Sequence, residues 1–362
     1  MAFKIFVVNP GGGTTKLAYF EDETRILKEE IEHNPIELNE LEKLDDQINY
    51  RMKQIEEFVN KSNLNLAQMD AFVGRGGAFY PLKSGVYFAD DDVLNDVKSG
   101  KVQADHPSNL GALIVNELGK IYKKPAFFVD PVSVDEFDDV SRLSGLKELE
   151  RKSLCHTLNT KYVARKVAEK HGKKYEELNL IVAHLGTGIS ISPHRKGKMF
   201  DVNNANDGGP FSPQRTGSLP VTGLIKLCYS GMHTEREMIR KVTKEGGLMS
   251  YLGTQDLKEV LKMAEKDEYA RLVYNAMIYQ IAKEIGAMSA ALKGKVDFII
   301  FTGGMSRSEE LINSLREYVE WIAPVEVIPG ENEMEALAFG ALRVLRGEEK
   351  PKKYRDFVKY RR

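Results

Sequence analysis

The chain has 362 residues, which is too long for one ordinary core, so two domains are expected. Apolar residues make up 42% of it and charged residues 29%, as in soluble globular proteins. The 52 Lys and Arg residues nearly balance the 53 Asp and Glu residues, and the net charge of -1 gives no electrostatic footprint for nucleic acid or an anionic membrane. No signal peptide opens the chain, and no apolar run approaches the ~18–20 residues that span a bilayer, so a cytoplasmic protein is expected. The two cysteines, Cys155 and Cys228, lie among apolar neighbours and are expected to be reduced core residues.

Strand and helix patterns alternate along the chain, which predicts an α/β protein. The helix expected at 268–292 is apolar nearly all round, which fits either deep burial in a core or an interface. Strands are expected at residues 3–8, 17–20, 71–73, 126–129, 180–184, 189–192, 297–301 and 325–328. Helices are expected at residues 35–59, 109–118, 159–170, 268–292, 309–321 and 333–346.

Two segments share one pattern. Residues 5–20 read IFVVNPGGGTTKLAYF and residues 180–195 read LIVAHLGTGISISPHR. In each, an apolar strand leads to a polar residue, Asn9 or His184, then to a glycine turn and a second strand. Such a repeat predicts two similar halves with a cleft between them.

Each glycine turn lets backbone N–H groups approach an anion with no Cβ in the way. Neither a Walker A loop nor a dinucleotide fingerprint fits, because both require a helix after the glycines and a strand follows here. The interpretation is a phosphate-binding hairpin, with a plain glycine-rich β-turn as the alternative. The expected phosphate-binding residues are Gly11, Gly12, Gly13, Thr14, Thr15 and Lys16 in the first hairpin, and Gly186, Thr187 and Gly188 in the second.

The segments NPGGGTTK, HLGTGISI and FTGGM together resemble the acetate and sugar kinase/actin superfamily. Within it, the chain resembles the acetokinase family along nearly its whole length, most closely at HLGTGISI and RKSLCHTLNTKYVARKVA. The length, VGRGG and NNANDGGPFSPQRTG resemble the butyrate kinase branch. The resemblance implies two duplicated actin-like (ribonuclease H-like) α/β domains with a nucleotide cleft between them. Domain I is expected at residues 1–152 plus a C-terminal helix at about 333–362, and domain II at 153–332.

The resemblance implies Mg²⁺-dependent phosphoryl transfer from ATP to a carboxylate, giving ADP and an acyl phosphate by direct in-line transfer. Butyrate or a branched short-chain acid is the expected acceptor, and acetate or propionate with the same mechanism is the alternative. A carboxylate is already an anion at pH 7, so it needs positive charge rather than a general base. A homodimer or higher homo-oligomer is implied, with no nucleic-acid or membrane partner. An actin-like protein that uses ATP as a switch, without acyl kinase activity, is the alternative of a different class.

The resemblance also assigns roles to single residues. Arg215 matches the arginine that stabilises the transferring phosphoryl group, and Arg75 is expected to bind the substrate carboxylate. Where Arg75 stands, acetate kinases carry a histidine, and their arginine lies three residues further from the paired glycines, on the N-terminal side. His184 is expected to donate to the γ-phosphoryl group, and His156 and His106 match two further active-site histidines. For each of these residues, an ordinary structural role is the alternative.

The metal and the nucleoside have their own candidates. Asp130 follows an apolar strand and is expected to position Mg²⁺ or its waters, together with Asn9 and Glu333. Glu333 also lies near the start of the last helix, where the helix dipole favours a carboxylate in any case. For adenosine, Gly303 and Gly304 would allow a close backbone approach, and Asp256 matches a ribose-binding position.

Overall fold

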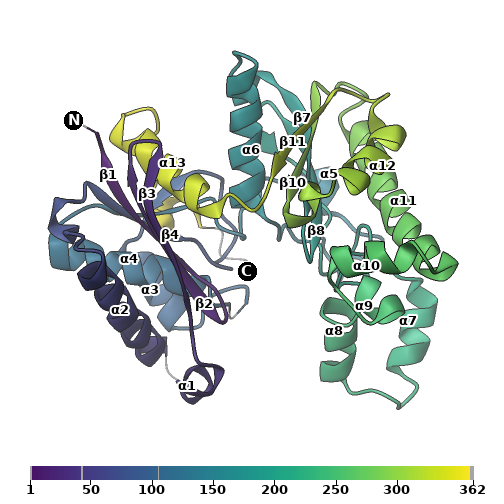
Figure 1. The fold of residues 1–362 in the computed structure, drawn as a ribbon, viewed down its shortest axis with the longest axis horizontal. Helices are drawn as coiled ribbons and strands as arrows, with labels where there is room; N and C mark the ends of the chain where they lie inside the picture. The colour runs from purple at the N-terminus through teal and green to yellow at the C-terminus, as the bar shows by residue number, and fades with distance from the viewer. Residues whose placement is uncertain (1, 42–43, 105, 359–362) are drawn as a thin grey trace. The chain divides into compact units, whose positions relative to one another are not determined.

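The computed structural model describes residues 2–41, 44–104 and 106–358 (Figure 1). The chain divides into two compact units: unit 1 comprises Met1–Asp135 and Asn332–Arg362, and unit 2 comprises Glu136–Glu331. Residues 136–152, placed in the first domain on sequence grounds, therefore lie in unit 2. The reason is a set of ion pairs, in which Asp138 contacts Arg195 and Lys198, and Arg151 contacts Asp201.

Unit 1 is built on a six-stranded sheet with the order β3-β2-β1-β4-β6-β5. Strands β1 and β2 form an antiparallel hairpin, and β4 continues the sheet parallel to β1. The strands are β1 Lys4–Pro10, β2 Thr14–Glu21, β3 Thr24–Glu32, β4 Ala71–Arg75, β5 Val86–Phe88 and β6 Ala126–Val129. The helices are α1 Pro35–Glu40, α2 Leu44–Lys61, α3 Asp91–Lys98, α4 Asn109–Tyr122, α13 Glu333–Leu345 and α14 Tyr354–Phe357.

Alternation along the strands of unit 1 separates its two faces. Phe6, Val8 and Phe72 join a buried cluster with residues of α2 and α4. On the other face lies α13, where a Cβ on Gly340 would overlap the side chain of Val129 in β6. Along β1 and β4, side chains an odd number of positions from Phe6 and Phe72, respectively, therefore point to the α13 face.

Two glycines allow α4 to pack against β4 without an intervening side chain. A Cβ on Gly74 would overlap the carbonyl oxygen of Gly111, and a Cβ on Gly111 would overlap the backbone of Arg75. The start of α4 thus lies against the end of β4, the strand that carries Arg75.

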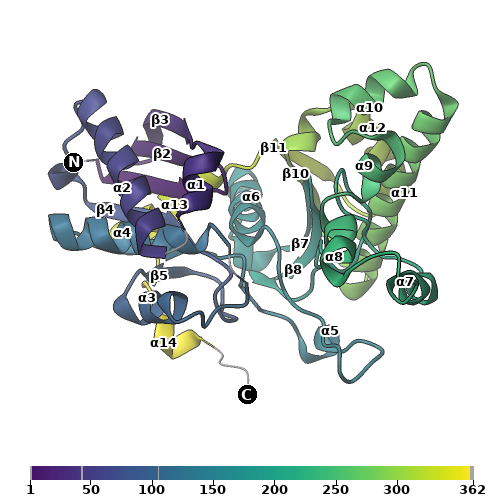
Figure 2. The same ribbon diagram turned by 90° about the horizontal axis from the view of Figure 1, so that it is seen from below.

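Unit 2 is built on a five-stranded sheet with the order β11-β10-β7-β8-β9. Helix α6 covers one face, and α11 and α12 cover the other (Figure 2). The strands are β7 Asn179–Leu185, β8 Ile189–Arg195, β9 Lys198–Met199, β10 Phe298–Gly303 and β11 Val325–Pro329. The helices are α5 Asp139–Arg142, α6 Thr157–Lys170, α7 Val221–Cys228, α8 Glu235–Thr243, α9 Gly247–Leu252, α10 Leu257–Ala264, α11 Glu268–Ala291 and α12 Glu309–Val319.

The two sheets share their central topology. In each, an antiparallel hairpin, β1–β2 or β7–β8, is followed by two further strands parallel to its first strand, β4 and β6 or β10 and β11. The prediction of an α/β protein with two similar halves is therefore confirmed.

Several elements differ from the sequence expectation. The helix expected at 35–59 is two helices, because Leu41 leaves helical geometry with a ψ of 78°. Strand β3 was not expected, because most of its residues are charged or polar and are exposed on the edge of the sheet. The short elements β5, α3 and α7 to α10 were also missed. Helix α11 buries one continuous stripe in the unit 2 core, so core burial explains most of its apolar residues.

The two cysteines differ from each other. Cys155 is buried, and burial raises the pKa of its thiol to about 11, so it is an unreactive core residue as expected. Cys228 is exposed at the end of α7, so the expectation of a core residue was wrong for it. Among the described residues, no helix combines the length and apolarity that a membrane crossing requires.

Candidate functional site

The second hairpin turn, residues 186–188, carries His184 on the strand that leads into it. Alternation along β7 turns His184 to the same face as Leu180 and Val182, where α6 packs. His184 Nδ1 lies 2.8 Å from Asn159 Oδ1. Because Asn159 Nδ2 donates to the carbonyl oxygen of Glu331 at 2.5 Å, its Oδ1 is the acceptor, and His184 therefore carries a proton on Nδ1. This leaves the Nε2 edge of His184 beside the turn, 3.2 Å from where a Cβ would stand on Gly186.

His156 lies directly against His184. The two rings stack with their centres 3.9 Å apart and their planes 8° from parallel. His156 Nδ1 lies 3.1 Å from the hydroxyl of Ser190, on the second strand of the hairpin. The stack fixes both rings, so the structure brings these two predicted residues together.

Arg215 lies over the same turn. Its guanidinium is so close to Gly188 that a Cβ there would stand 2.6 Å from Nη1. Ser212 holds the Arg215 loop to the turn, because its hydroxyl donates to the carbonyl of Thr187 at 2.6 Å and accepts from the Arg215 backbone N–H at 3.2 Å. Only a glycine at 188 leaves room for this arrangement.

Among the residues that the structure describes, the charge of Arg215 has no counter-ion. Burial lowers the pKa of the guanidinium, and in residues 2–41, 44–104 and 106–358 it makes neither an ion pair nor a hydrogen bond. A partly desolvated cation beside backbone N–H groups is an anion-binding arrangement. The half-site of unit 2 therefore consists of His156, His184, Arg215 and the second hairpin turn.

The predicted adenosine residues lie at other element ends in unit 2. Gly303 ends β10 with a φ of 91°, and a Cβ there would overlap the backbone of Leu185, so β10 approaches the end of β7 through glycine. Within the described part of the chain, a Cβ on Gly304 would meet nothing within 4 Å. Asp256 is exposed and accepts from the Lys258 backbone N–H at 2.8 Å, which makes it the N-cap of α10.

The first hairpin turn, residues 11–13, divides its predicted ligands between two faces of the sheet. Thr15 faces α2, where its hydroxyl lies 2.6 Å from Arg51 and 2.7 Å from His33. Lys16 faces the other way and lies 3.9 Å from Glu30 across the strand pair. The hydroxyl of Thr15 is thus hydrogen-bonded inside unit 1, on the opposite face of the sheet from Lys16.

Asn9, Arg75 and Glu333 form one polar cluster on the α13 face of unit 1. Asn9 and Arg75 point there because they are out of step with the core residues Val8 and Phe72. Asn9 Nδ2 donates to Glu333 Oε2 at 2.7 Å. Arg75 binds the same carboxylate through two nitrogens, with Nη1 3.2 Å from Oε2 and Nη2 3.0 Å from Oε1. The carboxylate predicted to bind the metal and the arginine predicted to bind the substrate are therefore partners of each other.

Asp130 lies in an unusual backbone conformation just after β6. Its φ of 37° is in the left-handed region, and its Oδ1 accepts from Ser84 Oγ at 2.6 Å and from Gly85 N–H at 2.8 Å. Such strain persists only where surrounding contacts hold it, and it is often found at functional sites.

The donor chemistry of Asp130 and Glu333 fits Mg²⁺, which takes one or two carboxylates beside waters and phosphate oxygens. Within the described residues, no three His, Cys, Asp or Glu side chains are grouped as a metal site. His106 lies just before α4, where its Nδ1 accepts from the Ser108 backbone N–H at 3.2 Å.

Two residues of the site escaped the sequence interpretation. Asn159 orients His184, and Ser212 fixes the Arg215 loop. A signal for Asn159 exists, since it is an amide on the buried face of α6 three positions after His156.

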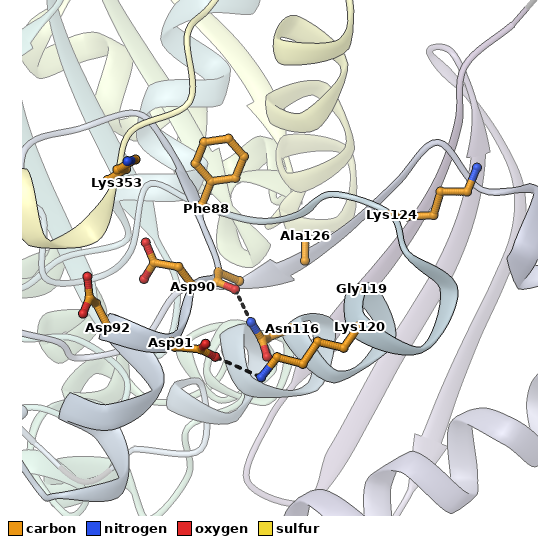
Figure 3. A pocket seen from close by; sticks show the side chains of 11 residues that line it. Phe88, Asp90, Asp91, Asp92, Asn116, Gly119, Lys120, Lys124, Ala126 and Lys353 are labelled. Carbon is orange, nitrogen blue, oxygen red and sulfur yellow. Dashed lines mark hydrogen bonds and ion pairs between the residues drawn. The ribbon is translucent and has the colours of Figure 1, made fainter.

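A further pocket of unit 1 contains none of the predicted site residues (Figure 3). It lies between the start of α3, α4 and Lys353, and Lys120 Nζ pairs there with Asp91 Oδ1 at 2.9 Å. Its three aspartates face three lysines, so it has no charge preference for a nucleotide. Its lining is Phe88, Ala89, Asp90, Asp91, Asp92, Asn116, Gly119, Lys120, Lys124, Ala126 and Lys353.

Comparison with known proteins finds one matching family model and several similar solved structures. Residues 146–322 match the model of the acetokinase family, a segment that includes His156, His184 and Arg215. The acetate kinase of Porphyromonas gingivalis is similar in structure, with a TM-score of 0.77 and 18% identity over 95% of this chain and 100% of that chain. An acetate kinase of Entamoeba histolytica has a TM-score of 0.73 and 16% identity, over 93% of this chain and 98% of that one. A propionate kinase of Francisella tularensis has a TM-score of 0.68 and 18% identity, with the same two coverages. The chain therefore has the fold of the acetate kinases, and its residues 146–322 carry the sequence pattern of the acetokinase family.

Proposed function

We propose that this protein is an ATP-dependent carboxylate kinase, which transfers the γ-phosphoryl group of ATP to a short-chain carboxylate and yields ADP and an acyl phosphate. The observation that carries the proposal is the guanidinium of Arg215, partly desolvated above Gly188 and without a counter-ion among the described residues. The family match over residues 146–322 supports it, because that segment contains the whole half-site of unit 2.

The proposed chemistry follows from the charges of the reactants. An anionic carboxylate must approach an anionic phosphoryl group, so the site must supply positive charge and N–H donors around that group. Arg215 would stabilise the charge of the phosphoryl group in transfer. His184 would add a donor from Nε2, since Asn159 already occupies Nδ1. Donation from Nε2 requires His184 to carry a proton on both ring nitrogens in that step.

The remaining predicted residues have supporting roles in the proposal. Residues 186–188 and the first hairpin turn would bind phosphates through backbone N–H groups, and Gly303, Gly304 and Asp256 would contact adenosine. Mg²⁺, held by Glu333 and Asp130 with Asn9 nearby, neutralises charge on the phosphates when bound. Arg75 already binds the Glu333 carboxylate. It would therefore hold the acceptor carboxylate only by dividing its N–H groups between the two carboxylates or by releasing Glu333. Use of ATP fits a cytoplasmic enzyme, which is also part of the proposal.

Butyrate or a branched short-chain acid is the acceptor we propose, on the resemblance of VGRGG and NNANDGGPFSPQRTG to the butyrate kinase branch. Acetate and propionate are the second candidates, because solved structures of similar fold are an acetate kinase and a propionate kinase. One methylene in an apolar pocket is worth about 1–3 kcal/mol, so neighbouring acids should react with graded efficiency.

Trapping the acyl phosphate with hydroxylamine, across straight and branched acids of two to six carbons, measures this preference. The expected result is the highest kcat/KM for a four- or five-carbon acid. A maximum at acetate would contradict the butyrate assignment and leave the carboxylate kinase in place. ATP binding with no acyl phosphate from any acid would favour an ATP switch instead.

A homodimer or larger homo-oligomer is part of the same proposal, and α7 supports it. None of the eight residues of α7 is buried within unit 2, and Val221 and Ile225 are 67% and 51% exposed. An isolated helix of this length is unstable in water, so packing against another surface would stabilise it.

Ile225→Glu is expected to reduce the mass in solution to that of the monomer, as measured by light scattering after gel filtration. Ile36→Glu is the matched control, because Ile36 is an equally apolar residue that is 70% exposed in α1 of unit 1. A monomeric wild type, or an oligomer that survives Ile225→Glu, would contradict this interface.

A further inference from the structure

Arg51 is a buried arginine on the apolar face of α2. It stands between Ile48 and Ile55 on the stripe that packs against the sheet of unit 1, and only 1% of it is exposed. In residues 2–41, 44–104 and 106–358 no carboxylate pairs with it. Burying a charge with no opposite charge beside it costs folding free energy, so the position of Arg51 is not explained by stability alone.

The guanidinium of Arg51 contacts the first hairpin turn from inside the unit. Its Nη2 donates to the carbonyl of Gly11 at 2.8 Å, and its Nη1 donates to the carbonyl of Thr14 at 3.1 Å. The backbone N–H of His33 donates to the carbonyl of Gly13 at 2.9 Å. The carbonyl oxygens of residues 11, 13 and 14 are therefore all bound on the inner side of the turn.

These contacts decide where the N–H groups of the turn point. In a planar trans peptide the C=O and the following N–H point in opposite directions. Holding the carbonyl of Gly11 inward thus turns the N–H of Gly12 outward. In the described part of the chain the N–H groups of Gly12 and Gly13 make no hydrogen bond, and a Cβ on Gly13 would meet nothing within 4 Å.

His33 and Thr15 complete the network without neutralising it. His33 Nε2 lies 2.9 Å from Arg51 and 2.7 Å from the Thr15 hydroxyl, so Nε2 is an acceptor. Burial, and secondly the charge of Arg51, lower the pKa of His33 to about 4, so the ring is neutral at pH 7. Among the described residues, two buried atoms of the network, Arg51 Nε and His33 Nδ1, have no hydrogen-bond partner, whereas most buried polar side-chain atoms in proteins have one.

We propose that Arg51 is a positioning residue for phosphate binding, which holds the first hairpin turn with its N–H groups outward and places an uncompensated positive charge behind it. This role rests on the proposed function, since it needs a phosphate ligand at residues 11–13. The anion on the outer side of the turn would supply the charge that the core does not.

Arg51→Met tests the role, because methionine is apolar, fits a buried helix face and removes every donor. Equilibrium binding of ATP, inorganic tripolyphosphate and adenosine separates the phosphate part of the affinity from the nucleoside part. Affinity for ATP and for tripolyphosphate should fall about 10- to 100-fold, as expected for lost charge-assisted interactions, while adenosine affinity is unchanged. Arg51→Lys keeps the charge but cannot bridge two carbonyls, so it should restore part of the loss.

Ile55→Ala is the matched control, since Ile55 is equally buried one turn along the same stripe. It should lower the melting temperature and leave the ATP dissociation constant within twofold of wild type. The proposal is overturned if Arg51→Met binds tripolyphosphate within twofold of wild type. It is also overturned if Arg51→Met loses affinity for adenosine as much as for ATP. A wild type that binds ATP but forms no acyl phosphate would remove only the proposed reaction, whereas a wild type that binds no nucleotide would remove both.

Discussion

Replacing Arg215 with alanine is expected to lower kcat for acyl phosphate formation by about 10³-fold or more. The guanidinium lies over Gly188 with no counter-ion among the described residues, so its charge is available to a phosphoryl group and to nothing else nearby. Because the charge on the phosphoryl oxygens has its largest effect during transfer, the loss should fall on kcat and leave the ATP dissociation constant within a few-fold. Steady-state kinetics with equilibrium ATP binding measures the two quantities separately.

Three further variants make this test specific. Arg215→Lys keeps a charge without the planar fork and should recover only part of kcat. Gly188→Ala leaves Arg215 intact but places a Cβ 2.6 Å from its Nη1, so it should displace the guanidinium and reproduce much of the loss. Arg240→Ala removes a surface arginine paired with Glu245 and should change nothing. Turnover that is unchanged in Arg215→Ala would remove this residue from the mechanism.

His184→Ala is expected to lower kcat by about 10²–10³-fold, the usual cost of one transition-state hydrogen-bond donor. The argument is geometric: Asn159 fixes Nδ1 at 2.8 Å, and the Nε2 edge lies beside the second hairpin turn. Asn159→Leu should produce a smaller loss in the same direction, because the ring remains but loses the acceptor that orients it. Asn159→Asp retains an acceptor and should recover part of the activity that Asn159→Leu loses.

His171→Ala is the control for the histidine series. His171 is in the same unit, pairs with Glu326 at the surface and stacks on Phe298, away from the hairpin turn. Its removal should leave kcat unchanged. A His184→Ala enzyme with wild-type kcat and altered ATP affinity would assign His184 to ground-state phosphate binding rather than to the transfer step.

The parts of the fold that the sequence predicts are those with strong local patterns. The two glycine hairpins are visible because an apolar strand, a glycine turn and a second strand repeat at Ile5 and Leu180. Strand β3 is invisible to the same method, because an edge strand with charged side chains has no apolar alternation to detect. The segment 136–152 joins unit 2 through ion pairs between residues far apart in the chain, and no local pattern reports such pairs.

The site divides in the same way. His184 and Arg215 are recognisable from short motifs, but their surroundings depend on tertiary contacts. The pairing of Arg75 with Glu333 joins residues 258 positions apart, so the sequence assigned them separate ligands. Arg51 carries a usable signal, a charged residue on an apolar helical stripe, but a buried arginine is not otherwise distinguishable from a surface one.

The close crossing of Gly74 and Gly111 sets a limit on how this protein can be re-engineered. Since backbone meets backbone there, the end of β4 and the start of α4 cannot slide or separate independently. The main chain that carries Arg75 therefore has a fixed position against α4. Under the proposed function, a change of acceptor acid would therefore come from exchanging side chains around Arg75, because moving the main chain there would break the packing of α4 against β4.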